Sequence, residues 1–184
     1  MTRRVPRNPA LIDALEAIPP EPFEGLLWRV TREGRDPCIG SRSGGRWDDQ
    51  SFDVLYTCET REGAIAEMRY HLGKGQPVVP SKPRYHLHEL KVELSAALVL
   101  TDAALLKRLG IDMSRFGRLT YVNREEEYTV SQAIGEIAVF LDLEAVRVPN
   151  ARHLESTNAV LFTERVDPDR LEHIHDHGVV NFAN

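Results

Sequence analysis

Hydrophobic and polar residues follow two spacings along this chain, one typical of helices and the other of strands. Leu11, Ile12 and Leu15 follow Asn8 and Pro9 at helical spacing, and an asparagine before a first-turn proline is a common helix start. Helices are predicted over Pro9–Ile18, from Thr60 to about Leu72, from Thr101 to about Leu109, and from a capping box of Thr129 and Gln132 to about Leu141.

Alternating apolar and polar positions predict strands among these helices. The strands are expected over Leu26–Thr31, Val54–Cys58, Arg84–Val99 (as one strand or two), Ala145–Val148, Ala159–Thr163 and Leu171–His175. The order does not repeat a regular strand–helix–strand rhythm, so a mixed sheet is favoured over a doubly wound parallel sheet. The expected fold class is α+β, with mixed central β-sheets and peripheral helices.

The length of 184 residues is that of one domain with short appendages. Residues 1–22 are expected to form an N-terminal helix and linker, and residues 23–184 to form the functional domain. Hydrophobic residues make up 42% of the chain and charged residues 28%, which is typical of a protein that buries a core without disulfides or metal.

Charge and apolar runs argue against several classes of protein. The formal net charge is −5, whereas nucleic-acid-binding proteins usually carry a basic field. The N-terminus holds Arg3, Arg4 and Arg7 without the apolar run of a secretory signal, and no stretch approaches the roughly 20 apolar residues of a membrane helix. Cys38 and Cys58 do not form a Cys-x-x-Cys pair and are expected to be free thiols. We therefore expect a cytoplasmic protein.

Two arginines are candidates for binding an anionic ligand. Gly44-Gly45-Arg46-Trp47 combines glycines, which let the backbone approach a ligand, with a guanidinium suited to phosphate oxygens. On its own the segment is more typical of a turn with a solvated arginine, and it lacks the Gly-Lys-Ser/Thr of a Walker loop. Arg29 lies within an apolar strand, on the face opposite Trp28 and Val30, where it meets either water or a polar cleft.

Two further side chains could contribute to the same cleft. Glu67 lies at the boundary of the apolar stripe of its predicted helix, a position where most glutamates are simply solvated. Tyr56 offers a ring and a hydroxyl from a half-buried strand, where tyrosine is usually structural.

His173, His175 and His177 alternate, so a strand would place them on one face, as in some metal sites. No cysteine or carboxylate cluster has a matching spacing, and we expect no metal. The charge run Arg124-Glu125-Glu126-Glu127 is interpreted as a solvated loop.

Read in order, several segments resemble the RES domain, the toxin half of a bacterial toxin–antitoxin pair. They span about Phe23 to Phe162, and their order and spacing carry the resemblance more than any one of them does. The segments are Trp28-Arg29-Val30, Gly44-Gly45-Arg46-Trp47, Val54-Leu55-Tyr56-Thr57, Ala64-Ile65-Ala66-Glu67, Ser131-Gln132-Ala133-Ile134-Gly135, Val148-Pro149-Asn150-Ala151-Arg152 and Asn158-Ala159-Val160-Leu161-Phe162.

The family is named for an arginine, a glutamate and a serine. Arg29 and Glu67 match the first two. The serine normally lies in a Pro-Ser-Ala-Arg segment, which here reads Pro149-Asn150-Ala151-Arg152, so Asn150 replaces it. Ser156 lies six residues further on, outside this frame. Asparagine still donates and accepts hydrogen bonds, but the change could alter the acceptor or slow the reaction.

The resemblance implies a fold similar to ADP-ribosyltransferase toxins and an enzyme that consumes NAD as its substrate. Glu67 would hold the ribose hydroxyls and stabilise an oxocarbenium-like ribose. Arg29 and Arg46 would bind the diphosphate or orient the nicotinamide ribose, and Tyr56 would contact the nicotinamide side. Asn150 would position ligand or acceptor, which makes Glu67, Arg29 and Asn150 the expected catalytic positions.

The resemblance also implies that ADP-ribose passes to water, phosphate or a target protein, and that a helix-turn-helix antitoxin of the Xre type blocks the site. Two other functions stay open. An RNA-targeting toxin could act through arginine and histidine, although the acidic balance argues against it. A catalytically silent binding module is the other alternative.

Overall fold

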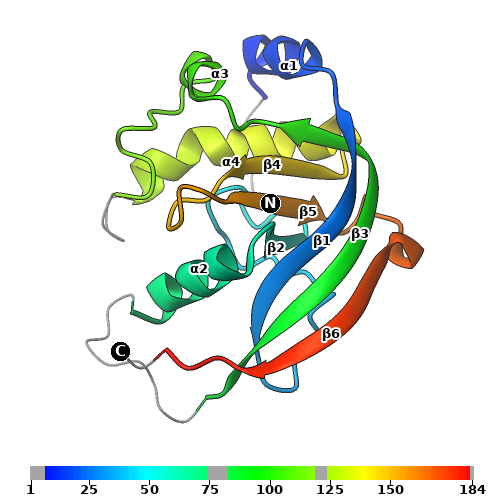
Figure 1. Ribbon diagram of the computed structural model, residues 1–184. Helices are drawn as coiled ribbons and strands as arrows, with labels where there is room; N and C mark the ends of the chain where they lie inside the picture. The colour runs from blue at the N-terminus through cyan, green and yellow to red at the C-terminus, as the bar shows by residue number, and fades with distance from the viewer. Residues whose placement is uncertain (1–6, 74–82, 119–123, 183–184) are drawn as a thin grey trace.

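The computed structural model describes residues 7–73, 83–118 and 124–182, and it shows curved strands flanked by helices (Figure 1). The mixed α+β class with peripheral helices is confirmed, while residues 1–6 of the predicted N-terminal segment lie outside the described residues. The elements are α1 (Pro9–Glu16), β1 (Glu21–Arg32), β2 (Val54–Cys58), α2 (Arg61–Gly73), β3 (Tyr85–Val99), α3 (Ala103–Arg108), α4 (Arg124–Phe140), β4 (Ala145–Pro149), β5 (Thr157–Phe162), a short 3-10 helix (Pro168–Arg170) and β6 (Leu171–Val179).

Strand β1 closes the sheet on itself. The strand order is β1-β2-β5-β4-β3-β6, and β1 also pairs with β3. The antiparallel β1–β3 ladder runs along the length of β1, whereas β1 meets β2 only where Trp28 pairs with Cys58. Strands β1 to β5 therefore form a small closed barrel, and β6 adds to the far side of β3.

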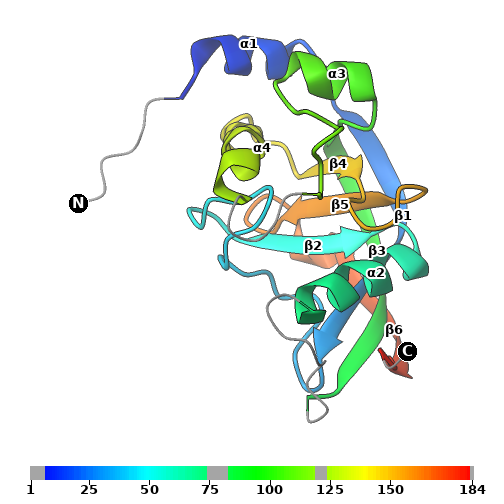
Figure 2. The same cartoon turned by 90° about the vertical axis from the view of Figure 1, so that its left-hand side faces the viewer.

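The strands enclose one apolar core, and the helices cover a second. Leu27, Leu90 and Leu161 are fully buried in the first. In the second, α1, α3 and α4 pack over β4 and β5 (Figure 2), and this core includes Leu15 of α1 and Ile134 of α4. Burying these side chains is the main source of stability for such a domain. No helix in the described part of the chain combines the length and apolar character needed to span a membrane.

Helix α2 lies against a third, smaller core. Ala64, Ile65 and Met68 of its predicted apolar stripe pack with Val30 of β1 and Leu87 of β3. This packing holds the helix beside β1 and β2 (Figure 2). The orientation of α2 also decides where its boundary residue Glu67 lies.

Most of the predicted elements are confirmed, with differences at their ends. Val54–Cys58 has the predicted bounds, and β3 is one continuous strand. Strand β1 starts at Glu21 instead of Leu26, because Glu21–Gly25 pairs with β3 although it lacks apolar alternation. The cap of α3 is Asp102, which accepts a hydrogen bond from the Leu105 N–H at 2.7 Å, and not Thr101.

The start of α4 was predicted wrongly. The helix begins at Arg124, so Thr129 lies within it instead of capping it, and the charge run predicted as a solvated loop is its first turn. The pattern misled because a Thr-x-x-Gln sequence inside a helix looks the same as a capping box before one.

Candidate functional site

A cavity of about 650 Å³ opens between α2, β1, β2 and the segments that follow β1 and β4. Arg29, Arg46, Tyr56 and Glu67 all line it, so the structure brings these four predicted site residues together. Asn150 is not among the lining residues, and its side chain is 0% exposed. Asn150 therefore cannot touch a ligand in the cavity directly.

The charges around the cavity differ from those of the whole chain. Among the described residues that line it, Glu67 is the one carboxylate, whereas the arginines are Arg29, Arg32, Arg35, Arg46 and Arg152. The chain as a whole has a net charge of −5. A concentration of guanidinium groups in a recess attracts anions, so the cavity is suited to a phosphate-bearing ligand.

The loop that carries Arg46 is held by its own backbone and by Asp48. Gly44 has a φ of 77°, which favours glycine, and its N–H donates to Oδ1 of Asp48 at 3.0 Å. The N–H of Gly45 donates to the Asp48 carbonyl at 3.1 Å. A Cβ on Gly45 would lie 2.4 Å from the hydroxyl of Tyr56. Both glycines are therefore needed for the shape of the loop.

Helix α4 fixes this loop from the other side. Nε2 of Gln132 donates to the carbonyls of Gly45 at 2.8 Å and Asp48 at 3.1 Å. A Cβ on Gly135 would lie 2.0 Å from the Trp47 carbonyl oxygen, so helix and loop are in close contact. The prediction that Gln132 belongs to a helix cap is wrong, because its side chain extends to the loop of Arg46.

The guanidinium of Arg46 lies over two aromatic rings. Its central carbon is 4.2 Å from the centre of the Phe116 ring and 4.9 Å from that of Tyr128. Cation–π contacts at these distances hold the charge in place at the cavity wall. Phe116 and Tyr128 were not predicted as site residues, because nothing in their sequence surroundings relates them to Arg46.

Tyr56 supports the Arg46 loop with its hydroxyl group. The hydroxyl accepts a hydrogen bond from the Trp47 N–H at 3.0 Å and donates to Oδ2 of Asp48 at 2.8 Å. Burial raises the pKa of Tyr56 well above its usual value, and the neighbouring Asp48 raises it further, so the phenol stays protonated. Burial also raises the pKa of Asp48, which the hydrogen bond from Tyr56 partly offsets. The ring of Tyr56 is what remains to contact a ligand.

Arg29 joins the cavity to the segment that follows β1. Its Nη1 donates to the carbonyls of Pro37 at 2.7 Å and Ile39 at 2.9 Å. Within the described part of the chain Nε and Nη2 have no such acceptor, so their hydrogens can bind a ligand. Burial lowers the pKa of Arg29 to about 10, and the nearby Arg35 lowers it as well. The group is therefore still charged at neutral pH. Of the two environments that the sequence allowed for Arg29, water or a polar cleft, the structure shows the cleft.

Glu67 faces the cavity from α2 and has a polar neighbour on β5. Nδ2 of Asn158 donates to its Oε1 at 3.2 Å, and Asn158 also lines the cavity. Asn158 was not predicted as a site residue, although it belongs to the family-like segment Asn158-Ala159-Val160-Leu161-Phe162. Its alternation on β5 placed it on a definite face, but the pairing with α2 could not be read from the sequence.

Arg152 also lines the cavity and was not predicted as a site residue, although it ends the Pro149-Asn150-Ala151-Arg152 segment. Its guanidinium carbon lies 3.2 Å from the centre of the Tyr70 ring, and its Nη1 donates to the Gly117 carbonyl. Its Nε is buried and has no hydrogen-bond partner among the described residues. A buried N–H without a partner is unfavourable, so an anion bound nearby would remove that cost.

The histidines of β6 form no common row. A bulge between Glu89 and Leu90 separates His173 from His177. His173 contacts His88 at 3.2 Å, whereas His177 contacts Glu89 at 2.8 Å and packs against Trp28 with the two rings tilted by 46°. Because residues 88 and 89 point to opposite faces of β3, the prediction of one shared face is wrong. No group of three or more metal-binding side chains occurs within the described ranges.

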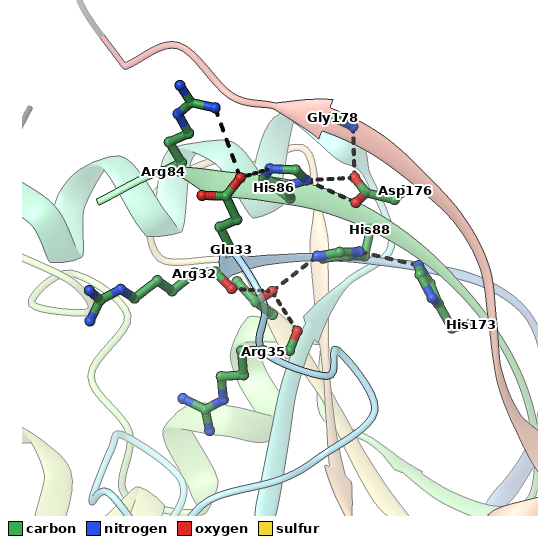
Figure 3. Close-up of polar contacts among 10 residues, drawn as sticks. Arg32, Glu33, Arg35, Arg84, His86, His88, His173, Asp176 and Gly178 are labelled. Atoms are coloured by element: carbon green, nitrogen blue, oxygen red, sulfur yellow. Dashed lines mark hydrogen bonds and ion pairs between the residues drawn. The ribbon is translucent and has the colours of Figure 1, made fainter. Parts of the chain in front are cut away.

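His86 and His88 of β3 and their partners form a polar cluster beside β1 (Figure 3). His86 lies between Glu33 at 3.7 Å and Asp176 at 2.8 Å, and His88 bonds to Thr31 at 3.0 Å. Burial lowers the pKa of His88. The cluster supports the strand that carries Arg29 without lining the cavity through its histidines.

Comparison with known proteins connects this geometry to a family. Residues 26–180 match the RES domain. The fold is similar to that in the crystal structure of the M. tuberculosis MbcT–MbcA toxin–antitoxin complex, with a TM-score of 0.79 and 21% identity over 95% of this chain and 94% of that chain. At this identity the likeness concerns the fold alone. No curated protein matches the sequence.

Proposed function

Because the chain belongs to the RES domain family, we propose that it is a toxin that consumes NAD by cleaving the bond between nicotinamide and ribose. The observation that carries the proposal is the convergence of Arg29, Arg46 and Glu67 on one cavity. Guanidinium groups suit a diphosphate, and a single carboxylate suits a ribose on which positive charge develops.

In the proposed reaction, the bond from ribose C1′ to the nicotinamide nitrogen breaks and its electron pair leaves with nicotinamide. Nicotinamide departs as a neutral molecule, so the site needs no general acid at that nitrogen. The carboxylate of Glu67 would hold the ribose hydroxyls and stabilise the charge on the ribose.

The cationic groups would bind and orient the rest of the substrate. Arg46, held over Phe116 and Tyr128, and the remaining N–H groups of Arg29 would bind the diphosphate. The ring of Tyr56 would pack against the nicotinamide side, because its hydroxyl is engaged with the loop. Asn150 is buried behind the cavity wall and would act on the substrate only through the side chains that it contacts.

The acceptor of ADP-ribose distinguishes three versions of this function. Attack by water gives ADP-ribose and a proton, attack by phosphate gives a phosphorylated ADP-ribose, and attack by a protein side chain gives a modified target. Incubation of the pure protein with labelled NAD, with phosphate and with cell extract separates them by the labelled product.

We also propose a cytoplasmic location and a helix-turn-helix antitoxin of the Xre type that covers the cavity. Two large apolar side chains are exposed on segments beside the cavity, Ile39 at 59% and Leu154 at 80%. Apolar residues on an antitoxin would bury them.

The substitution Glu67→Gln tests the proposed reaction, because it removes the negative charge and keeps the shape. We expect nicotinamide release to fall by about 100-fold or more, since groups that stabilise a developing charge contribute at least this much. Circular dichroism should show an unchanged fold. Full NAD consumption by this variant would refute the site, and RNA loss in cells with unchanged NAD would favour the RNA-targeting alternative.

A further inference from the structure

Two asparagines lie beside Glu67, the buried Asn150 and the half-buried Asn158, and the backbone determines how their amides are oriented. Oδ1 of Asn150 accepts hydrogen bonds from the N–H groups of Arg152 at 2.7 Å and His153 at 2.8 Å. Backbone N–H groups can only donate, so the oxygen of the Asn150 amide must face them. Its nitrogen must therefore point the other way, toward Asn158.

The orientation of Asn150 determines that of Asn158. Nδ2 of Asn150 donates to Oδ1 of Asn158 at 2.9 Å, so the nitrogen of Asn158 faces the cavity. That nitrogen donates to Oε1 of Glu67 at 3.2 Å. Reversing Asn150 would leave the buried N–H groups of Arg152 and His153 without their acceptor, and reversing Asn158 would place its amide oxygen against the carboxylate of Glu67; both changes are unfavourable.

The same buried residues also determine how closely α2 approaches the sheet. Gly63 precedes Glu67 by one helical turn, on the same side of α2. A Cβ on Gly63 would lie 2.3 Å from Sγ of Cys58 and 2.9 Å from Nδ2 of Asn150. The helix therefore rests on the group that orients Asn158, and Glu67 is constrained both by the helix and by the amide.

We propose that Asn158 is a positioning residue for Glu67 and that Asn150 acts through Asn158 and not on the ligand. This inference rests on the proposed function for its kinetic consequences. With Oε1 held by Asn158, Oε2 of Glu67 is directed to the ribose. The replacement of the family-like serine by Asn150 then supplies an amide whose orientation is fixed, whereas a serine hydroxyl could rotate.

A double-mutant cycle tests the coupling between the two asparagines. Asn158→Ala should lower kcat about 10-fold while the KM for NAD changes less than about 3-fold, because orientation and not binding is lost. Asn150→Ala should lower kcat similarly, and the double variant should be no slower than Asn158→Ala alone. Ser131→Ala, which removes a buried hydrogen bond of α4 to the Tyr128 carbonyl, is the matched control. Losses that multiply in the double variant would overturn the proposal.

Asn158→Asp supplies a readout that a merely structural role would not change. The aspartate can still accept from Asn150 but places a second carboxylate against Glu67. Two adjacent carboxylates resist joint ionisation, so the acid limb of the activity profile should move up by about one pH unit. An acid limb at the same pH as in the wild type would contradict the contact between residue 158 and Glu67.

The same shift can be measured without activity, by following the carboxyl carbon of Glu67 by NMR as pH is varied. This measurement separates the two proposals. If the wild-type protein consumes no NAD, the proposed function fails, while the titration still tests the contact between Asn158 and Glu67.

Discussion

Arg46 and Glu67 face the same cavity, but the protein holds them by different means. Arg46 lies on a loop whose carbonyl groups are bound by Gln132 and whose N–H groups are bound by Asp48 and Tyr56. Glu67 lies on a helix that rests through Gly63 on buried side chains.

Because the two groups are held differently, mutations near each of them should change different kinetic constants. A disturbed loop should move the cation that binds the substrate, so KM should respond most. A disturbed helix should move the carboxylate at the reacting bond, so kcat should respond most. In the proposed function, the contacts that hold the Arg46 loop and the packing that holds α2 can therefore be removed separately by mutation.

The largest effect is expected from Gly63→Ala, which tests the support of the helix. The new methyl group meets Cys58 at 2.3 Å, so α2 must shift away from the sheet. A displacement of about 1 Å can lower a rate about 100-fold, and overpacking costs about 1–3 kcal/mol of stability. Steady-state kinetics and thermal unfolding measure both effects.

Gly73→Ala is the matched control on the same helix. A Cβ there meets nothing within 4 Å among the described residues, and alanine favours helix over glycine by up to about 1 kcal/mol. We expect wild-type kcat and equal or higher stability. Should Gly63→Ala also keep the wild-type kcat, the packing of α2 would not be what positions Glu67.

A smaller effect is expected from Gln132→Ala, which tests the support of the loop. The carbonyls of Gly45 and Asp48 lose their side-chain donor, and about 1–2 kcal/mol is a typical cost. We expect KM for NAD to rise about 10-fold and kcat to change less than about 3-fold.

The control for the loop is Glu136→Ala, on the same helix. Its side chain pairs with Arg7 at 2.6 Å and has no hydrogen bond to the loop among the described residues. KM should stay at the wild-type value in this variant. A fall in kcat without a change in KM for Gln132→Ala would show that the two supports are not independent.

The smallest effect is expected from His88→Gln, which changes the dependence of stability on pH. Burial lowers the pKa of His88 below its usual 6.5, so the unfolded chain takes up a proton first as pH falls, and stability is lost below about 6.5. Glutamine does not titrate, so Tm should fall less between about pH 7.5 and 5.5 than in the wild type. Equal losses of Tm in the wild type and in His88→Gln would exclude His88 as the cause.

The sequence predicted the elements better than the contacts between them. Strand β2 and the helix after Thr60 follow from apolar periodicity, and the N–H of Gly63 does donate to the Thr60 hydroxyl at 3.1 Å. The closure of the barrel does not follow, because the first five residues of β1 carry no alternation and pair only in the presence of β3. Periodicity describes which side of an element is buried but not what lies opposite.

In the candidate site, too, the residues could be predicted from the sequence but the contacts that support them could not. The convergence of Arg29, Arg46, Tyr56 and Glu67 was expected from a resemblance, and the cavity contains all four. The need for a glycine at position 63 depends on Cys58 and Asn150, which only the fold brings beneath it.

The supports of both charged groups come late in the chain. Gln132 follows Gly45 by 87 positions, and Asn158 follows Glu67 by 91. A ribosome that has translated the first half of the protein has therefore produced Arg46 and Glu67, with Asp48 and Tyr56, but neither Gln132 nor Asn158. A nascent chain that ends before Asn158 cannot orient Glu67 in this way, which would delay any harm to the cell that makes it until synthesis is nearly finished.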